Sequence, residues 1–350
     1  WDAAQKALET GDGSATAVRV TLQLSEDRGN AIETLFAGVF GENATNIATS
    51  ATAGKSGVFC LLALDKKGKG LEVKKDSELE LRACGAQVNS TSKEALKVEG
   101  KKSSLIGDGF CVSGGAKVKG GATVSPQPSE YCPPHVDPLA DLQIPTAGAC
   151  TDNKAEFKNE TITFSPGRVF CNGLKLTGNT QAFMEPGTYF VVDGKFELKN
   201  NAKLEGDGVT IVLQGDKAEI DIKEKAYVQL TAPTSGDMKG LLIVQNDALG
   251  SGSQRAGRGD DDDEGIGERD LLDNKWDSKA PSELTGVIYL PRDRFTTKLD
   301  INITGTEACF VVIAEEIKVD GKARMLIDLS GSGCRGSLPP AFNRKVVLLA

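Results

Sequence analysis

The chain has 350 residues, 39% of them hydrophobic, and its 41 basic and 49 acidic side chains give a net charge of −8. It has no basic stripe of the kind that binds nucleic acid or an anionic membrane surface. No run of about 20 apolar residues is present to span a bilayer or form a signal peptide. Because the chain starts with Trp1 and not Met, we expect an upstream membrane anchor to have been lost from a longer precursor.

The first 57 residues have a pattern different from that of the rest. Residues 2–8 and 30–40 carry apolar side chains at helical spacing, whereas residues 18–24 alternate like a half-buried strand and residues 47–53 form a weaker strand pattern. The sequence therefore predicts a small membrane-proximal α/β segment over 1–57. We expect it to cap the first coil of the region that follows.

From Val58 onward, short apolar-x-apolar runs return at a nearly constant interval. Phe196 follows Leu174 by 22 residues, and Ile220 follows Phe196 by 24. Each run is too short to bury a face by itself and has to stack on the next copy. Further runs begin at Leu71, Leu96 and Ala116, and a second set of apolar or small residues recurs at Ala182, Leu204 and Val228.

This spacing predicts a mainly β fold, a right-handed parallel β-helix over 58–350 with the α/β segment in front of it. The alternative is an antiparallel β-sandwich, against which two-residue hairpin signals are rare, Asn172-Gly173 being the main one. Two interruptions are expected. Residues 126–145 form a Pro-rich excursion, and residues 249–281 form a flexible acidic insertion whose composition cannot bury a core.

The eight cysteines favour disulfides and an oxidising, extracytoplasmic compartment, because they are even in number and widely spaced. In chain order, successive pairs are 24, 21, 21 and 25 residues apart, close to one turn of the repeat. Residues one turn apart in a parallel β-helix lie about 4.8 Å apart, which a disulfide accepts. The predicted pairs are Cys60–Cys84, Cys111–Cys132, Cys150–Cys171 and Cys309–Cys334.

Several segments, in this order and spacing, resemble the extracytoplasmic part of TadG-like Flp (tight adherence) pilus-assembly proteins. They cover most of residues 58–330 and comprise Cys60-Leu-Leu-Ala-Leu-Asp65, Ala83-Cys84-Gly-Ala-Gln-Val-Asn-Ser90, Phe110-Cys111-Val-Ser-Gly-Gly115, His135-Val-Asp-Pro-Leu-Ala140, Gly206-Asp-Gly-Val-Thr210, Leu230-Thr-Ala-Pro-Thr-Ser235 and Leu284-Thr-Gly-Val-Ile-Tyr-Leu290. The resemblance implies a bacterial envelope or surface protein linked to tight-adherence pili, with no enzymatic activity. The family's N-terminal hydrophobic helix is missing here, and the acidic stretch 257–270 has no counterpart in the resemblance.

The clearest candidate site is an acidic run that could bind calcium weakly through clustered carboxylates. The run consists of Asp260, Asp261, Asp262, Asp263 and Glu264. An EF-hand is excluded because position 12 of the loop would be Leu271, not glutamate. Arg258-Gly-Asp260 matches an adhesion tripeptide, but the Gly-rich acidic composition favours a solvated linker here.

No catalytic or cofactor-binding residue is expected. His135 is the one histidine, lies in a Pro-rich loop and has no evident nucleophile beside it. The outward positions Lys175, Glu197, Asp221 and Lys223 mix both charges, which is typical of a solvated face with ion pairs between coils, not of paired catalytic carboxylates.

The sequence thus predicts a non-enzymatic structural or adhesive protein of the bacterial cell envelope, periplasmic or at the cell surface. Its expected partners are pilus or envelope proteins and further copies of the chain. Copies would associate by stacking their coil ends into filaments. The alternative is a carbohydrate-binding or polysaccharide-active β-helix protein.

Overall fold

The computed structural model describes residues 17–25, 27, 32–33, 44–45, 47–55, 59–246, 271–280, 282–298, 301–303, 309–330, 338–339 and 346–349. The chain divides into two compact units, one formed by residues 1–57 with 343–350 and the other by residues 58–342. The described residues contain no α-helix, so none of them forms a helix long and apolar enough to cross a membrane.

The smaller unit is built from antiparallel strands. β1 (Ala17–Leu24) and β31 (Val346–Leu349) pair with opposite edges of β4 (Ile47–Lys55), and β2 (Ile32–Glu33) pairs with β3 (Ala44–Thr45). The two predicted strands are confirmed. The prediction of an α/β segment is wrong at residues 32–33, which are a strand and not part of a helix, while the predicted helix at 2–8 lies outside the described residues.

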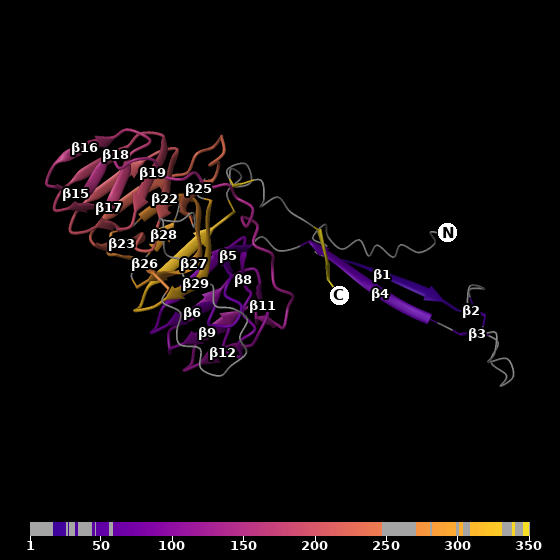
Figure 1. Cartoon of the computed structure of the whole chain (residues 1–350). Coiled ribbons are helices and arrows are strands. Elements are labelled where there is room, and N and C mark those ends of the chain that lie inside the picture. Colours follow the sequence, from indigo (N-terminus) through magenta and orange to yellow (C-terminus); the bar gives the residue numbers. More distant parts are fainter. Residues whose placement is uncertain are drawn as a thin grey trace, which may run out of the picture. The chain divides into compact units, whose positions relative to one another are not determined.

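The larger unit is a stack of parallel β-coils in which each strand pairs with a strand of at least one neighbouring coil and most pair on both sides (Figure 1). Each coil contributes strands to three ladders. The first ladder contains β5 (Phe59–Ala63), β8 (Gly85–Val88), β11 (Phe110–Val112), β14 (Ser129–Glu130), β19 (Gly187–Val192), β22 (Val209–Gln214), β25 (Leu241–Asn246) and parts of β15 (Asp152–Lys158), β17 (Val169–Thr177), β27 (Ser282–Thr297) and β29 (Phe310–Val319).

Within each coil, the chain passes from the first ladder to the second at one corner and from the second to the third at the next corner. The second contains β6 (Leu71–Lys74), β9 (Leu96–Glu99), β12 (Ala116–Lys119), β20 (Lys195–Leu198), β23 (Glu219–Glu224), β26 (Asp273–Ser278) and the remaining parts of β15, β17, β27 and β29. The third contains β7 (Glu78–Arg82), β10 (Ser104–Ile106), β13 (Thr123–Ser125), β28 (Ile301–Ile303) and β30 (Arg324–Asp328), and, among the other coils, β16 (Thr161–Phe164), β18 (Gln181–Met184), β21 (Lys203–Gly206), β24 (Tyr227–Thr231) and the start of β27.

The apolar repeat noted in the sequence forms one column of the second ladder. Leu174 pairs with Phe196, and Phe196 pairs with Ile220, all fully buried. Leu71 and Leu96 continue the same column toward Ala116. The predicted stacking of these runs is therefore confirmed, and so is that of Ala182, Leu204 and Val228 in the third ladder.

The order of the coils in space differs from their order in the chain. β29 pairs with β5 and β6, and β30 pairs with β7, so the last described coil stacks directly on the first. Figure 1 accordingly shows β27 and β29 between the strands of the two halves. From one end to the other, the coils follow as 152–164, 169–184, 187–206, 209–231, 241–285, 286–303, 310–328, 59–82, 85–106 and 110–125.

The predicted architecture, one open right-handed parallel β-helix wound continuously from a capped first coil, is therefore wrong. The first coil of the chain is enclosed, with β29 on one edge of β5 and β8 on the other. The chain winds three coils, crosses the length of the stack through residues 131–150, which we call the strap, and winds back until it closes on its own beginning.

Two further expectations need correction. Val346–Leu349 does not end the coil ladder but pairs antiparallel with β4 in the smaller unit. The insertion is shorter than predicted, because β26 lies inside 249–281 and pairs with β23, so that Trp276 stacks on Ile222 and is 1% exposed. Residues 247–270 lie outside the described residues.

Asn172 and Gly173 form a corner and not a hairpin turn. Both lie within β17, between the part that belongs to the first ladder and the part that belongs to the second. Their φ angles are 58° and 101°, the left-handed region that asparagine and glycine tolerate best. A Cβ atom on Gly173 would lie 2.7 Å from the Lys195 carbonyl oxygen of the next coil, so the close spacing of the coils also requires glycine.

Candidate functional site

The strap is fastened to the stack by a disulfide at each end. Cys132 is bonded to Cys111 of β11, and Cys150 is bonded to Cys171 of β17, with Cα–Cα distances of 5.8 and 5.6 Å. β11 and β17 belong to coils near opposite ends of the stack. The strap therefore spans most of the length of the first ladder.

The strap contains no β-strand, and its sequence explains why. Pro133, Pro134, Pro138 and Pro145 fix φ near −65° and remove the backbone donors that a ladder needs. An extended chain of this kind has to be held by side chains of the surface it crosses.

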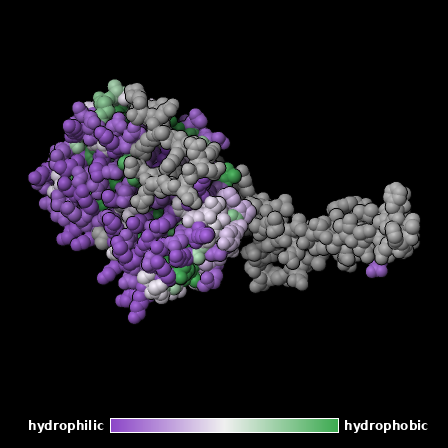
Figure 2. Space-filling model, turned by 60° about the horizontal axis from the view of Figure 1, so that its bottom comes forward, coloured by the Kyte–Doolittle hydropathy of each residue, from purple (hydrophilic) through white to green (hydrophobic). Residues whose placement is uncertain are grey.

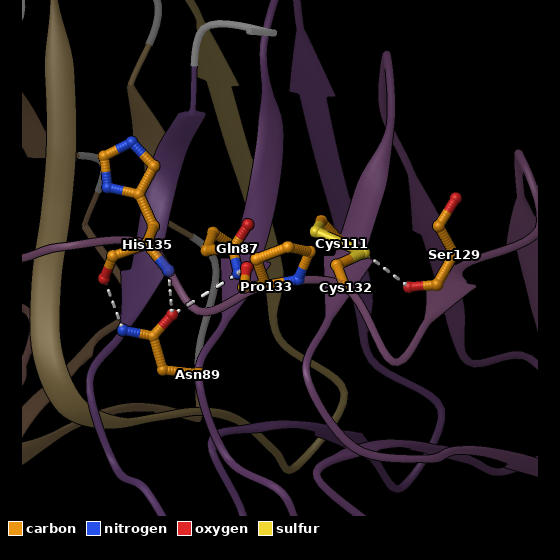
Figure 3. Close-up of a disulfide and its surroundings, with 7 residues drawn as sticks. All are labelled: Gln87, Asn89, Cys111, Ser129, Cys132, Pro133 and His135. Atoms are coloured by element: carbon orange, nitrogen blue, oxygen red, sulfur yellow. Dashed lines mark hydrogen bonds between the residues drawn. A yellow bond between two sulfur atoms is a disulfide. The ribbon is translucent and has the colours of Figure 1, made fainter. Parts of the chain in front are cut away.

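Polar side chains of the first ladder bind the strap in the order of the coils. The Asn89 amide donates to the His135 carbonyl oxygen and accepts from the His135 backbone N–H, both at 2.8 Å, and Gln87 donates to the Pro133 carbonyl oxygen (Figure 3). Farther along, the Tyr289 hydroxyl lies 2.8 Å from an Asp137 carboxylate oxygen. Asn89 and Gln87 thus fix the start of the strap to the coil of β8, and Tyr289 fixes Asp137 to the coil 286–303.

The contacts continue to the far half of the stack. The Asn246 side chain donates to the Pro145 carbonyl oxygen at 2.9 Å, and the Ala147 N–H donates to Gln214 Oε1 at 2.9 Å. Asn246 and Gln214 are the last residues of β25 and β22, neighbouring strands of the first ladder. These side chains therefore fix which part of the strap lies on which coil.

Beneath the strap, the first ladder presents an apolar column. Its members pair in sequence from coil to coil and all are at most 9% exposed: Leu62, Ile313, Tyr289, Val244, Val212, Phe190 and Val169. Leu139 of the strap is 4% exposed, and Leu142, Ile144 and Ala147 pack against the same core. The strap thus gives the first ladder a second buried face.

The second ladder presents charges on its outer face. Lys223 contacts Glu197 of the neighbouring coil and Asp221 of its own strand, both at 2.9 Å, and Lys175 contacts Glu156 at 2.7 Å. Burial lowers the pKa of Lys223, but hydrogen bonds to Asp221 and Glu197 outweigh this and raise it overall. The predicted mixed-charge face is confirmed, and Figure 2 shows a mainly hydrophilic surface on the stack with small separate hydrophobic patches.

Ion pairs also cross the seam where β29 and β30 meet β6 and β7. Lys75 lies 3.1 Å from Asp320, and Arg324 lies 3.0 Å from Glu78. Burial alone would raise the pKa of Asp320, but the hydrogen bond from Lys75 and the charges of Lys318 and Lys75 bring it below its ordinary value. The ionised carboxylate therefore favours the closed seam.

A half-buried pair next to this seam behaves differently. Arg294 lies 2.5 Å from a Glu316 carboxylate oxygen on the neighbouring coil. Burial nevertheless raises the pKa of Glu316 above its ordinary value, because the charge and hydrogen bond of Arg294 offset only part of the desolvation. The seam thus contains carboxyl groups whose pKa values move in opposite directions.

Three of the four predicted disulfides are formed: Cys60–Cys84, Cys111–Cys132 and Cys150–Cys171. Cys309 is also disulfide-bonded, and its predicted partner Cys334 lies outside the described residues. The same holds for the acidic run 260–264 and the tripeptide 258–260, so their proposed cation-binding and adhesive roles stay predictions. Within the described segments, no group of three or more potential metal ligands is found.

His135 has a structural position. Its backbone is held by Asn89, its ring packs edge-on against Phe59 with centroids 5.8 Å apart, and Nδ1 lies 2.7 Å from the Val136 carbonyl oxygen. No serine, threonine or cysteine is among these described contacts of the ring. The imidazole therefore belongs to the attachment of the strap.

Two adjacent grooves lie where the strap meets the loop between β24 and β25. One has a volume of about 390 Å³ and the other about 420 Å³, and Asp237 lines both. Polar groups in the two grooves come from Gln143, Ser235 and Asp141, over an apolar floor that includes Met238 and Leu142. Hydroxyl, amide and carboxylate groups beside apolar surface suit a ligand rich in hydroxyl groups.

Sequence reasoning treated residues 126–145 as an excursion and did not find the strap. The available signal was the apolar run Ile211-Val-Leu213 in β22, a strand whose six residues are all buried. A strand buried on both faces reads as a continuous apolar run, whereas one with a solvated face alternates. Such runs beside the alternating β23 and β24 indicate that one face of the stack is covered.

Comparisons of the chain with protein-family models, curated proteins and solved structures gave no match.

Proposed function

We propose that this protein is a non-enzymatic structural or adhesive component of the bacterial cell envelope or cell surface, associated with the assembly of Flp-type (tight adherence) pili. The observation that carries the structural role is the strap, which is disulfide-bonded near both ends of the stack. The pilus association rests on the sequence resemblance to TadG-like proteins over most of residues 58–330. Disulfides are compatible with an extracellular or periplasmic location.

The physical basis of the proposal is mechanical. Coils joined by backbone hydrogen bonds resist local opening only as well as their weakest interface. The strap links coils far apart in the stack, and the ion pairs between Lys75 and Asp320 and between Arg324 and Glu78 hold the seam. This arrangement suits a rigid surface for envelope or pilus proteins.

Self-association of the chain belongs to this proposal, with a constraint on how it occurs. β14 pairs with the outer edge of β11, and Glu130 accepts a hydrogen bond of 2.6 Å from the Ala116 N–H. β14 thus occupies the place where a further coil would pair in the first ladder. At this end of the stack, a second copy would have to use the edges of β12 and β13, where Val118 is 40% exposed.

The proposal is tested by deleting the gene in a piliated bacterium that encodes this chain. We expect the protein in the periplasm or at the surface and fewer assembled pili in the deletion strain, with restoration by the full chain. The control is a strain that lacks the pilin, which separates envelope localisation from pilus assembly. A cytoplasmic protein, or unchanged pili in the deletion strain, would overturn the proposal.

The second candidate function is binding of an envelope polysaccharide, favoured by the two grooves around Asp237. An Asp237→Ala variant should then lose retention on a column of envelope polysaccharide, while Asp216→Ala, a matched change outside the grooves, should keep it. Cleavage of the polysaccharide by the purified chain would favour an enzyme. Absence of both binding and cleavage agrees with the structural role.

A further inference from the structure

We propose that the two strap disulfides form a latch that an external dithiol opens while the Cys60–Cys84 disulfide stays intact. Opening would release the strap and uncover the apolar column of the first ladder. Exposure of the outer face of the first ladder would then depend on the redox state of four cysteines, which a purely structural role does not require. It stands on the positions of the sulfur atoms and on the contacts of the strap.

The three disulfides for which the structure describes both cysteines fall into two groups by accessibility. Cys60 is 0% and Cys84 is 1% exposed, so an attacking thiolate cannot reach either sulfur without unfolding of the coil. Cys150 is exposed, and Cys111 and Cys132 are half-buried at the surface where the strap begins (Figure 3). Both accessible disulfides fasten the strap, whereas the buried one joins two consecutive coils.

The chemistry is thiol–disulfide exchange with a dithiol as the reductant. A thiolate of the dithiol attacks the exposed Cys150 sulfur, the bond to Cys171 breaks, and the Cys171 thiolate leaves and takes up a proton. The second thiol of the dithiol then displaces Cys150 from the mixed disulfide. Two electrons and two protons enter the protein, and the dithiol becomes a disulfide. The same steps at Cys132 free Cys111.

Once both disulfides are open, the remaining attachments are few for so long a segment. They include the side-chain hydrogen bonds of Gln87, Asn89, Tyr289, Asn246 and Gln214, backbone hydrogen bonds at Tyr131 and Cys132, the contact of the His135 ring with Phe59, and the packing of a few apolar side chains. The strap makes no ladder of its own, so its release breaks no strand pairing within the stack. An open strap therefore leaves the coils in place and exposes Val212, Val244 and their neighbours.

The order of reduction tests the first part of the proposal. The full chain is incubated near pH 8 with increasing dithiothreitol, trapped with N-ethylmaleimide and mapped by mass spectrometry. We expect Cys111, Cys132, Cys150 and Cys171 to be labelled at least about tenfold faster than Cys60 and Cys84, because exposure controls access of the thiolate. Equal labelling of these six of the eight cysteines would overturn the latch.

Release of the strap tests the second part. After removal of the reductant, hydrogen exchange in residues 133–149 should rise at least about tenfold, and thermolysin should cut beside Leu139 or Leu142, while the strands keep their protection. A C111S/C132S/C150S/C171S variant should show this open state without reductant. The C111S/C132S variant, still fastened at Cys150–Cys171, should open only near His135.

If the four-serine variant does not fold, the reduced and trapped native chain still gives the answer. If all four cysteines carry the label and the strap amides are still as protected as in the oxidised chain, the proposal is overturned. Loss of protection throughout the stack at the same reductant concentration would also overturn it, because the strap would then be part of the fold and not a latch on it.

Discussion

The first and second ladders belong to the same coils, but the outer face of the first is buried and that of the second is solvated. In the first ladder, β22 and β25 are buried at every residue, because the strap covers them. In the second, β23 alternates between buried isoleucines and outward charged residues that pair across coils. The difference teaches that the outer face of a parallel coil is set by what lies on it, and that one crossing segment can convert a solvated sheet into a two-sided core.

The largest effect is expected from a charge placed under the strap. Val212→Asp buries an unpaired carboxylate at a position that is 0% exposed, which should lower the free energy of unfolding by about 3 kcal/mol or more. Chemical denaturation followed by circular dichroism measures the change. Lys203→Asp, on an exposed position of the third ladder, should shift it by less than about 0.5 kcal/mol. Similar losses for both would show that the strap does not seal the first ladder.

A second effect is expected at the corner between the two ladders. Gly173→Ala adds a Cβ atom within 2.7 Å of the Lys195 carbonyl oxygen at a φ of 101°, and should cost about 1–3 kcal/mol. Gly167→Ala is the matched control, since its φ is 82° but a Cβ there meets nothing within 4 Å. Thermal unfolding of both variants separates coil contact from backbone strain, and equal shifts would contradict a role for coil spacing.

The attachment of the strap should be weakened by Asn89→Ala. The variant loses both hydrogen bonds to His135, so the backbone of that residue is left without its partner, at a cost of about 1–3 kcal/mol. Hydrogen exchange at residues 133–137 should rise, with little change in the second ladder. Asn201→Ala, which removes an exposed hydrogen bond to Asn179, is the control. Unchanged exchange at His135 would argue against Asn89 as an anchor.

The ion pairs at the seam predict that the free energy of unfolding depends on pH. The folded pKa of Asp320 lies below its ordinary value of 3.8, so its contribution is present above pH 3.8 and is lost as the pH falls through the lower folded pKa. Glu316 has a raised pKa and opposes this trend. Asp320→Asn isolates the effect: it should lower stability by about 1 kcal/mol at pH 7 and by nothing at a pH where Asp320 is protonated. A loss that is the same at both pH values would contradict the role of the charge.

The smallest effect is expected on the outer face of the second ladder. Lys223→Met removes the contacts with Glu197 and Asp221 and should change stability by no more than about 1 kcal/mol, because the side chain is 35% exposed and salt screens such pairs. Urea denaturation at low and high salt measures it. A larger loss would mean that the charge ladder holds the coils as firmly as the strap.

Local regularities were predictable because they depend on short spacings. The repeat at Leu174, Phe196 and Ile220 forms one column, and the cysteine spacing gave three pairs that the structure contains. The burial of Trp276 was not predicted, because β26 follows a long acidic stretch. This strand is nevertheless part of the second ladder. The helix expected at residues 30–40 failed at its start, since apolar spacing over so short a segment does not separate a helix from paired strands.

The sequence by itself determined which residues stack, because each rung has to bury its apolar positions on the next rung at a nearly fixed interval. Only the tertiary structure decided the order of the coils. The pairing of β29 and β30 with β5, β6 and β7 joins residues about as far apart in the chain as the stack allows. Because every coil has a similar edge, local spacing does not determine which two edges pair. The strap follows from that pairing, since a chain that ends where it began has to cross the whole stack once, and the face it crosses becomes core.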